Sequence, residues 1–162
     1  MPIILYRVDE RLIHGQVVVG WGNSLKINRI VLVNDQVAQS PWERELYLAC
    51  VPPEMKTTIL AVDEGVGKIL QNGFKGERAV ILVDSPFDIL RMVEKGIKIN
   101  SVNVGGVHSK TKRMKILPYL FLSQEEISAF KRIISSGIKC ECRDVPLAEK
   151  HDLSSLFDKL KL

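Results

Sequence analysis

Side chains that can handle a phosphoryl group are concentrated near the start of the sequence, in Asp9-Glu10-Arg11-Leu12-Ile13-His14-Gly15-Gln16. A neutral imidazole such as that of His14 is a competent nucleophile, and phosphoryl transfer otherwise requires positioning and stabilisation of charge. The planar guanidinium of Arg11 matches phosphate oxygens, and the carboxylate of Asp9 can orient His14 or Arg11 by a hydrogen bond. The segment therefore has the parts for transfer of a phosphoryl group through His14.

The place of this segment in the chain favours the same chemistry. An apolar run over Ile3–Val8 predicts a strand, and Gly15–Leu25 predicts the helix that follows it. Free backbone N–H groups and the helix dipole attract anions to a helix start, so we assign Gly15 and Gln16 to phosphate binding. The residues alone leave a second interpretation open, in which His14 caps the helix and Arg11 pairs with a surface carboxylate.

The rest of the chain alternates short apolar runs with amphipathic stretches, and the alternation predicts strands and helices in turn. The further strands are expected at Arg29–Asn34, Lys56–Val62, Arg78–Val83, Ile99–Val104, Lys115–Phe121 and Lys139–Arg143. The further helices are expected at Pro41–Cys50, Asp63–Gln71, Pro86–Glu94, Ser123–Ser136 and Leu153–Leu160, with Ser40, Asp63, Ser85 and Ser123 as N-caps. This rhythm predicts an α/β fold, with an open, mainly parallel sheet of about seven strands and helices on both faces.

In such a sheet ligands bind beyond the carboxyl ends of the strands, so the residues after each strand are the next candidates. Ser85 follows the fourth strand, where its hydroxyl can bind phosphate or cap its own helix. Gly105 and Gly106 follow the fifth, where they can form a second wall of a phosphate pocket or simply make a turn. Asn34-Asp35 after the second strand fits either a polar contact with the site or helix-start chemistry.

Two features near the glycine pair each have two interpretations, one as a functional group and one as part of a solvated loop. His108 is either a second reactive group or a solvated loop histidine. The basic segment Lys110–Lys115 can steer a phosphate-bearing partner towards the protein or can be a solvated loop.

Bulk properties narrow the function classes. The net charge of +4 and pI near 9.0 fit an anionic ligand or an acidic partner, while an aromatic content of 6% offers little for stacking nucleic-acid bases. Three cysteines are too few for a disulfide framework. The sequence lacks an apolar run of about 20 residues and a signal peptide, so we expect a cytoplasmic protein.

Two alternatives start from the same residues. A metal-dependent hydrolase would use Asp9, His14 and His108, although these lack the tight spacing usual for metal ligands, and no metal or other cofactor is expected. A module that binds a nucleotide or phosphorylated metabolite is the other alternative, but the chain has neither G-x-x-x-x-G-K-[ST] nor G-x-G-x-x-G after the first strand.

The segment Arg7–Val17 resembles the phosphorylation site of IIB domains in the mannose/fructose/sorbose family of the bacterial sugar phosphotransferase system. The resemblance continues in order along essentially the whole chain, through Val33-Asn34-Asp35, Trp42–Leu46, Ala49–Pro52, Ser101–His108 and Arg143–Pro146. It implies a single IIB phosphocarrier domain over residues 1–162.

The resemblance also implies specific roles and partners. His14 is expected to accept a phosphoryl group on Nδ1 from a phosphohistidine of a IIA protein, with Arg11 holding the phosphate. The group would then pass to a hexose-type sugar during uptake by the membrane subunits IIC and IID, which makes the chain a protein-N(π)-phosphohistidine–sugar phosphotransferase. A IIB-like regulatory phosphoprotein without a transport role and a homodimeric state both remain compatible with the sequence.

Overall fold

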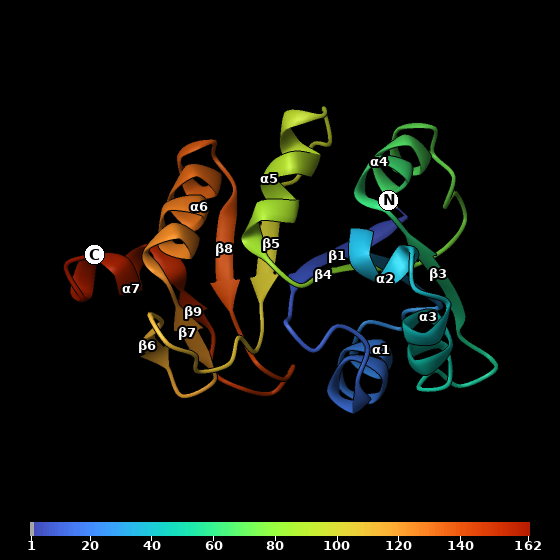
Figure 1. The fold of residues 1–162 in the computed structure, drawn as a ribbon, viewed down its shortest axis with the longest axis horizontal. Helices are drawn as coiled ribbons and strands as arrows, with labels where there is room; N and C mark the ends of the chain where they lie inside the picture. The colour runs from blue at the N-terminus through green and yellow to red at the C-terminus, as the bar shows by residue number, and fades with distance from the viewer. Residues whose placement is uncertain (1) are drawn as a thin grey trace.

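A seven-stranded sheet is the centre of the computed structural model, which describes residues 2–162 (Figure 1). Its strands are β1 (Ile3–Val8), β2 (Arg29–Val33), β3 (Lys56–Leu60), β4 (Ala79–Val83), β5 (Ser101–Val104), β8 (Lys139–Cys142) and β9 (His151–Asp152). They lie in the order β3-β2-β4-β1-β5-β8-β9, and only the β8–β9 pair is antiparallel. The predicted open, mainly parallel α/β sheet is confirmed. The single-domain boundaries stay a prediction, and their first residue, Met1, lies outside the described residues.

Helices cover both faces of the sheet, as predicted. One face holds η1 (Gln16–Trp21), α1 (Gly22–Ser24), α2 (Asp35–Ala38) and α3 (Pro41–Leu48); the other holds α4 (Val62–Leu70), α5 (Pro86–Glu94), α6 (Gln124–Ser135) and α7 (Leu153–Lys159). Alternate residues of each strand serve the two cores: on β2, Val31 and Val33 pack under α4, whereas Ile30 and Leu32 pack under η1. The near-continuous Val/Ile/Leu strands follow from this double burial.

The predicted strand over Lys115–Phe121 is wrong. This stretch belongs to a small antiparallel hairpin of its own, formed by β6 (Met114–Leu117) and β7 (Leu120–Leu122). Pro118 lies between the two strands, where its missing N–H and fixed φ favour a turn over a continuing strand. The short elements α2 and β9 were not predicted, because two to four residues give no readable periodicity.

Helix starts agree with the sequence at two of the four predicted caps. Ser40 and Ser123 each accept a hydrogen bond from the backbone N–H three residues on, and Ser123 does so within a capping box. The cap at Asp63 is wrong, since α4 begins one residue earlier and Glu64 bonds the free N–H of Ala61. Ser85 occupies the N-cap position of α5, but its side chain accepts no capping hydrogen bond.

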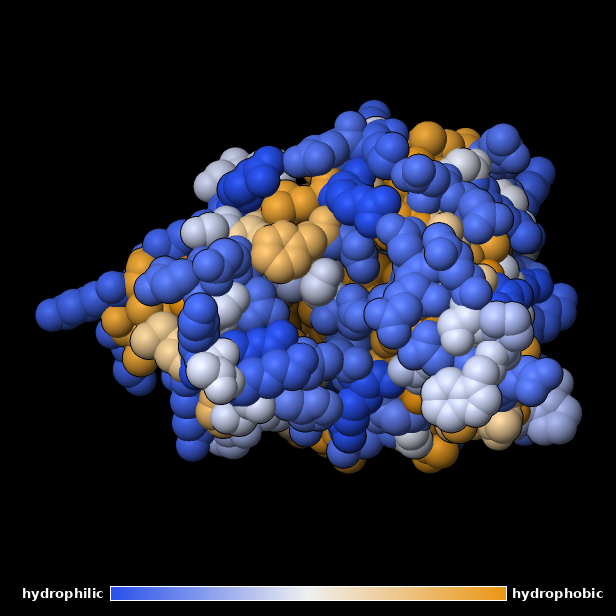
Figure 2. All heavy atoms as spheres, in the orientation of Figure 1, coloured by the Kyte–Doolittle hydropathy of each residue, from blue (hydrophilic) through white to orange (hydrophobic). Residues whose placement is uncertain are grey.

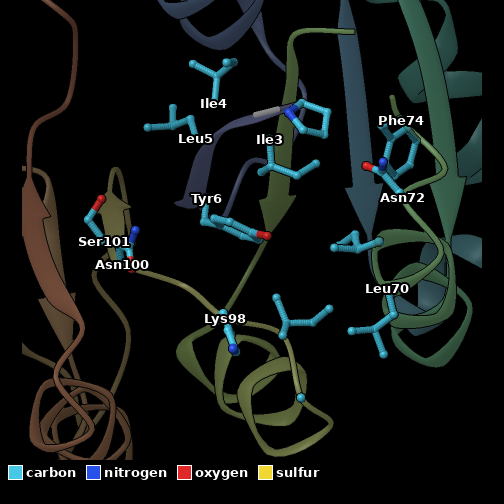
Figure 3. A pocket seen from close by; sticks show the side chains of 14 residues that line it. Ile3, Ile4, Leu5, Tyr6, Leu70, Asn72, Phe74, Lys98, Asn100 and Ser101 are labelled. Carbon is cyan, nitrogen blue, oxygen red and sulfur yellow. The ribbon is translucent and has the colours of Figure 1, made fainter. Parts of the chain in front are cut away.

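A cavity of about 470 Å³ opens at the amino-terminal half of β1. It arises because β1 pairs with β5 only at Arg7 and Val8, so that Ile3–Tyr6 are all partly exposed although β1 is a central strand. The Tyr6 ring lies in this space (Figure 3), and burial raises the pKa of its hydroxyl to about 12. His14 follows the opposite end of β1, so the cavity is separate from the candidate site.

The outer surface is mixed in character. Figure 2 shows a mainly hydrophilic face on which apolar atoms form separate patches rather than one continuous area. No helix within residues 2–162 is both long and apolar enough to cross a bilayer.

The first turn of α5 generates a prediction on pH and stability. Burial raises the pKa of Asp88 to about 6, helped by the charges of Asp84 and Asp35 and opposed by Arg91. In an unfolded chain the pKa of an aspartate is about 3.9. Ionisation of Asp88 therefore destabilises the folded state at neutral pH, and this destabilisation disappears as the pH falls from about 7 to 4. Asp88→Asn should therefore raise the free energy of unfolding by about 1–3 kcal/mol at pH 7.5.

Urea denaturation at pH 7.5 and pH 4.5 measures this effect, and the gain should shrink markedly at the lower pH. Asp158→Asn, at an exposed position of α7, is the matched control and should change stability little at either pH. An equal gain at both values would contradict the assignment to ionisation of Asp88.

Candidate functional site

The loop between β1 and η1 presents His14, and it is tied to both neighbouring strands. The N–H of Asp9 donates to Val83 O at the end of β4 (2.9 Å), and the N–H of Glu10 donates to Gly106 O after β5 (2.9 Å). Leu12 has a φ of 60° and is only 2% exposed, so its buried side chain holds the backbone in the sparsely populated left-handed region. These anchors give His14 a defined position at the carboxyl edge of the sheet.

The predicted contact between Asp9 and His14 is present. Oδ2 of Asp9 lies 2.9 Å from Nε2 of His14, with the carboxylate fully buried and the imidazole 14% exposed. An ionised carboxylate only accepts hydrogen bonds, so Nε2 holds a proton, and in the neutral ring Nδ1 then keeps its lone pair. The nitrogen that the resemblance assigns to phosphorylation is therefore the one outside this bond.

Arg11 and Gln16 lie together beside the same carboxylate. Nη2 of Arg11 donates to Oε1 of Gln16 (3.0 Å), while its backbone N–H donates to Oδ1 of Asp9 (3.1 Å) and its Nε is 3.8 Å from that oxygen. The side chain is 39% exposed. Arg11 thus pairs with a buried carboxylate rather than a surface one, and its guanidinium remains accessible to an anion.

The helix after the loop differs from the predicted α-helix over Gly15–Leu25. Its first part, η1, is a π-helix, and the helical stretch ends at Ser24. The carbonyl of His14 accepts from the N–H groups of Val17 and Val18 (3.1 and 3.0 Å), so the first helical hydrogen bonds form on His14 itself. Gly15 takes the N-cap position, and a Cβ there would have open space around it. Wide π turns of this kind are frequent at functional sites.

Arg7 is the main residue that the sequence analysis missed. It is fully buried, and its Nη2 donates to Oδ2 of Asp9 (3.0 Å) and to the carbonyl of Asp144 (3.0 Å). Its Nη1 donates to the carbonyl of Arg143 (3.0 Å) and to the side chain of Asn103. The signal was available: an arginine inside the apolar run IILYRV must be buried in a central strand, and Asp9 two residues on shares its face.

Trp21 joins the end of η1 to this network. Two guanidinium groups lie over its ring, with Cζ of Arg7 and Cζ of Arg143 at 5.1 and 5.0 Å from the centroid. Its Nε1 donates to the carbonyl of Asp144 (3.1 Å). The connection between β8 and β9 is thereby held against Arg7 and Trp21.

The two predicted glycines have different surroundings. A Cβ on Gly105 would lie 2.5 Å from Cζ of Arg7 and 2.9 Å from Oδ2 of Asp9, so only glycine leaves room for this ion pair. A Cβ on Gly106 would meet nothing closer than 3.9 Å, where it would approach Nη2 of Arg11. Their predicted role in phosphate binding stays a prediction, and Gly105 has a structural task besides.

The residues that follow the other strands mostly make structural hydrogen bonds at helix starts. Asn34 caps α2 through Val37 N–H, and Asp35 accepts from Val62 N–H. Nδ1 of His108 lies 3.1 Å from Glu10, away from the contact that Asp9 makes with His14, so the three residues of the metal-hydrolase alternative are divided between two contacts.

Within the basic segment Lys110–Lys115, only Arg113 is largely buried. It pairs with Glu10 and Glu126 at 2.8 and 2.9 Å, whereas Lys110 is 62% exposed. Arg113 therefore stabilises the loop rather than offering its charge to a partner.

Electrostatics favour an ionised Asp9. Burial alone would raise the pKa of this carboxyl, but the hydrogen bond from His14 and the charge of Arg7, with the N–H of Arg11, hold its pKa below the ordinary value. Burial in turn lowers the pKa of Arg7, and the charge of Asp9 opposes that effect. The two buried charges thus support each other, and His14 keeps an anionic acceptor at neutral pH.

Comparisons with known proteins agree with this geometry. The family model described as "PTS system sorbose subfamily IIB component" matches residues 3–162. The chain belongs to this family of IIB components. It is 31% identical over 157 residues to the fructose-specific EIIB component of Bacillus subtilis (strain 168), covering 97% of this chain and 96% of that protein.

Two further relatives place the IIB chain among known structures and longer proteins. It is 35% identical over 162 residues to the mannose-specific EIIAB component of Escherichia coli (strain K12), covering 98% of this chain but only 50% of that protein. The IIBSor domain of the sorbose permease from Klebsiella pneumoniae superposes with a TM-score of 0.91 at 28% identity, over 98% of each chain. Phosphoryl transfer in sugar uptake is thereby the established setting for this IIB chain.

The glycine pair provides a matched test of the buried network. Gly105→Ala should lower the free energy of unfolding by about 1–3 kcal/mol, because its Cβ would overlap the Arg7–Asp9 pair. Gly106→Ala should change it by less than about 0.5 kcal/mol, because its Cβ has room. Chemical denaturation of both variants measures the difference; equal stabilities would contradict the packing described for Gly105.

Proposed function

We propose that this chain is the phosphoryl carrier of a sugar phosphotransferase system, with Nδ1 of His14 as the atom that accepts the group. The observation that supports this most is the 2.9 Å contact of Asp9 Oδ2 with His14 Nε2, which leaves the lone pair on Nδ1. Membership of the IIB family supplies the reaction, and the residue roles are our assignment. The carrier is proposed to occupy residues 1–162 as one domain.

In the first transfer, the lone pair on Nδ1 attacks the phosphorus of a phosphohistidine on a IIA partner. The N–P bond of the partner breaks as the new one forms, and the electron pair returns to the partner's ring nitrogen. Arg11, which donates to Gln16 and is 39% exposed, is proposed to meet the phosphoryl oxygens with its guanidinium. Backbone N–H groups at Gly15 and Gln16 and the start of η1 favour the same negative charge.

In the second transfer, a sugar hydroxyl held by the membrane subunits attacks the phosphorus on His14, and we propose that a base on the membrane side takes its proton. Asp9 faces a ring that is positively charged while it holds the phosphoryl group, because Nε2 keeps its proton. Ser85, Gly105 and Gly106 are proposed as further contacts of the phosphoryl group at the same sheet edge. The imidazole returns to its neutral state after each cycle.

The partners follow from the same family. The mannose relative is named an EIIAB component, and this chain matches half of it, which supports a IIA protein or domain as the partner. We propose that the chain works in the cytoplasm, at the inner membrane face beside IIC and IID. The mainly hydrophilic surface in Figure 2 fits brief, polar docking. A homodimer is compatible with this arrangement, and size-exclusion chromatography with light scattering tests it.

A reconstituted relay tests the central assignment. Phosphoenolpyruvate, the general phosphotransferase proteins and a cognate IIA should add one phosphate to the wild-type protein, detected by intact mass and lost in acid. His14→Ala should gain none, since it lacks the accepting nitrogen, whereas His151→Ala, in β9, should behave as wild type.

Failure of the wild type with a panel of demonstrably charged IIA proteins would reject the carrier function. Addition of a membrane fraction containing IIC and IID with a sugar should discharge the phosphate. Retention of the phosphate with every sugar would indicate a regulatory phosphoprotein instead.

The role of Arg11 makes a second prediction. Arg11→Gln should slow phosphorylation of His14 by roughly 10- to 100-fold, because a preorganised charge at the phosphoryl oxygens is lost. Stopped-flow or quenched-flow transfer from charged IIA measures the rate. Arg44→Gln, on α3, is the control and should transfer at the wild-type rate; an unchanged rate in Arg11→Gln would reject phosphate stabilisation by Arg11.

A further inference from the structure

Arg7 is a charged side chain with no solvent exposure in the central strand of the sheet. Burial of an uncompensated charge is strongly unfavourable, so a buried arginine persists only where an opposite charge compensates it. The Nε of Arg7 is buried without a hydrogen-bond partner among the described residues, so its contacts are made by the two Nη atoms. Both Nη atoms of Arg7 are used, on Asp9, Asn103 and two carbonyls of the β8–β9 connection. Asp9 is the one anion to which it donates directly among the described residues.

The contact with Asp9 bears directly on His14. A single oxygen of Asp9, Oδ2, accepts from Nη2 of Arg7 (3.0 Å) and faces Nε2 of His14 (2.9 Å). The other oxygen accepts from the Arg11 N–H. Any change in the protonation of this carboxylate therefore changes the hydrogen bond that the imidazole makes.

The two protonation states of Asp9 have opposite consequences for the imidazole. An ionised carboxylate can only accept, so the ring proton stays on Nε2. A protonated carboxyl can donate to Nε2, which places the ring proton on Nδ1 and removes the nucleophilic lone pair. Burial favours the protonated form, and the charge of Arg7 opposes it.

We propose that Arg7 selects the nitrogen of His14 that takes the phosphoryl group, by keeping Asp9 ionised and thereby the ring proton on Nε2. Arg7 is a positioning residue in this scheme, since it acts through Asp9 and does not touch the phosphoryl group. The inference rests on the proposed function of His14 and extends it to a side chain buried behind the site.

The charge balance of the transfer gives Arg7 a second effect. When Nδ1 forms its bond to phosphorus and the partner's N–P bond breaks, the His14 ring keeps the Nε2 proton and becomes positively charged. Asp9 then pairs with a cation on each side, Arg7 and the phosphorylated ring. When the sugar oxygen forms its bond to phosphorus, the N–P bond of His14 breaks and its electron pair returns to Nδ1, and no proton moves through Arg7 or Asp9.

Other charged groups around this pair enter the pH dependence. Arg11 and His14 face Asp9 from its own loop, and the carboxyl of Asp144 and the hydroxyl of Tyr119 interact with Arg7. The guanidinium of Arg143 lies 5.0 Å from the centroid of the Trp21 ring, which also contacts Arg7. These groups remain in the variants below, so differences between the variants report the charge at position 7.

The experiment reads the tautomer of His14 by ¹⁵N NMR of histidine-labelled protein, with the signal assigned by its absence in His14→Ala. Neutral wild-type His14 should have its proton on Nε2. Arg7→Gln should move the population towards the Nδ1–H form and slow phosphorylation by charged IIA by roughly 10- to 100-fold. The acid limb of its rate–pH profile should shift to higher pH, since Asp9 must ionise without a neighbouring cation.

Arg7→Lys keeps the positive charge and should restore the Nε2–H form and most of the rate. Arg29→Gln is the matched control: it removes an arginine that pairs with Glu77 at the start of β2, and it should leave the His14 tautomer and profile unchanged. Rescue by lysine separates the charge effect from packing alone.

An Nδ1–H tautomer in the wild type, or an unchanged tautomer and pH profile in folded Arg7→Gln, would overturn the proposal. Should Arg7→Gln not fold, Asn103→Ala decides in its place: it keeps the charge of Arg7 and removes only a neutral hydrogen-bond partner, so the Nε2–H form and the pH profile should stay as in the wild type. A shift of either readout in Asn103→Ala would show that packing, not the charge of Arg7, sets the tautomer. The tautomer is read without phosphate, so it stands apart from a failure of the relay itself.

Discussion

The buried carboxylate of Asp9 is the constraint on which the site depends. It is fully enclosed, yet the imidazole needs it in the anionic form, so compensating donors must surround it. Arg7 supplies the charge, the Arg11 N–H supplies a neutral donor, and Gly105 leaves the space that both partners require. The loop before η1, the central strand β1 and the turn after β5 thus all contribute a group that stabilises or makes room for the carboxylate of Asp9.

Much of the fold could be predicted because the sequence patterns that indicate its strands and helices are local. Apolar runs with turn residues between them located β1, β2, β3, β4, β5 and β8, and Ser123 with Glu126 marked a helix start three residues apart. The hairpin of β6 and β7 was misread because an apolar run does not reveal a reversal at Pro118. The π-helix was misread because an apolar pattern over nine residues does not distinguish hydrogen bonds to the fourth from those to the fifth residue back.

The candidate site divides in the same way. Asp9, Arg11, His14 and Gln16 lie within eight residues, and their contacts followed from chemistry at short range. Four further residues contact Arg7 only because the chain folds, and no spacing in the sequence indicates this: they are Trp21, Asn103, Arg143 and Asp144. Arg7 is an intermediate case. Its position in an apolar strand could have indicated a buried ion pair, but not its hydrogen bonds to the distant carbonyls of Arg143 and Asp144.

The hydrogen bonds of Arg7 to these distant carbonyls have a consequence for the chain while it is being synthesised. Arg7 binds backbone oxygens 136 and 137 residues further along, and Trp21 is fastened to the same stretch. A ribosome delivers the loop with His14 long before it delivers Arg143 and Asp144, so a nascent chain has His14 before it has the environment of His14. Competence to accept phosphate is therefore expected to arise only after Arg143 and Asp144 have emerged and reached Arg7.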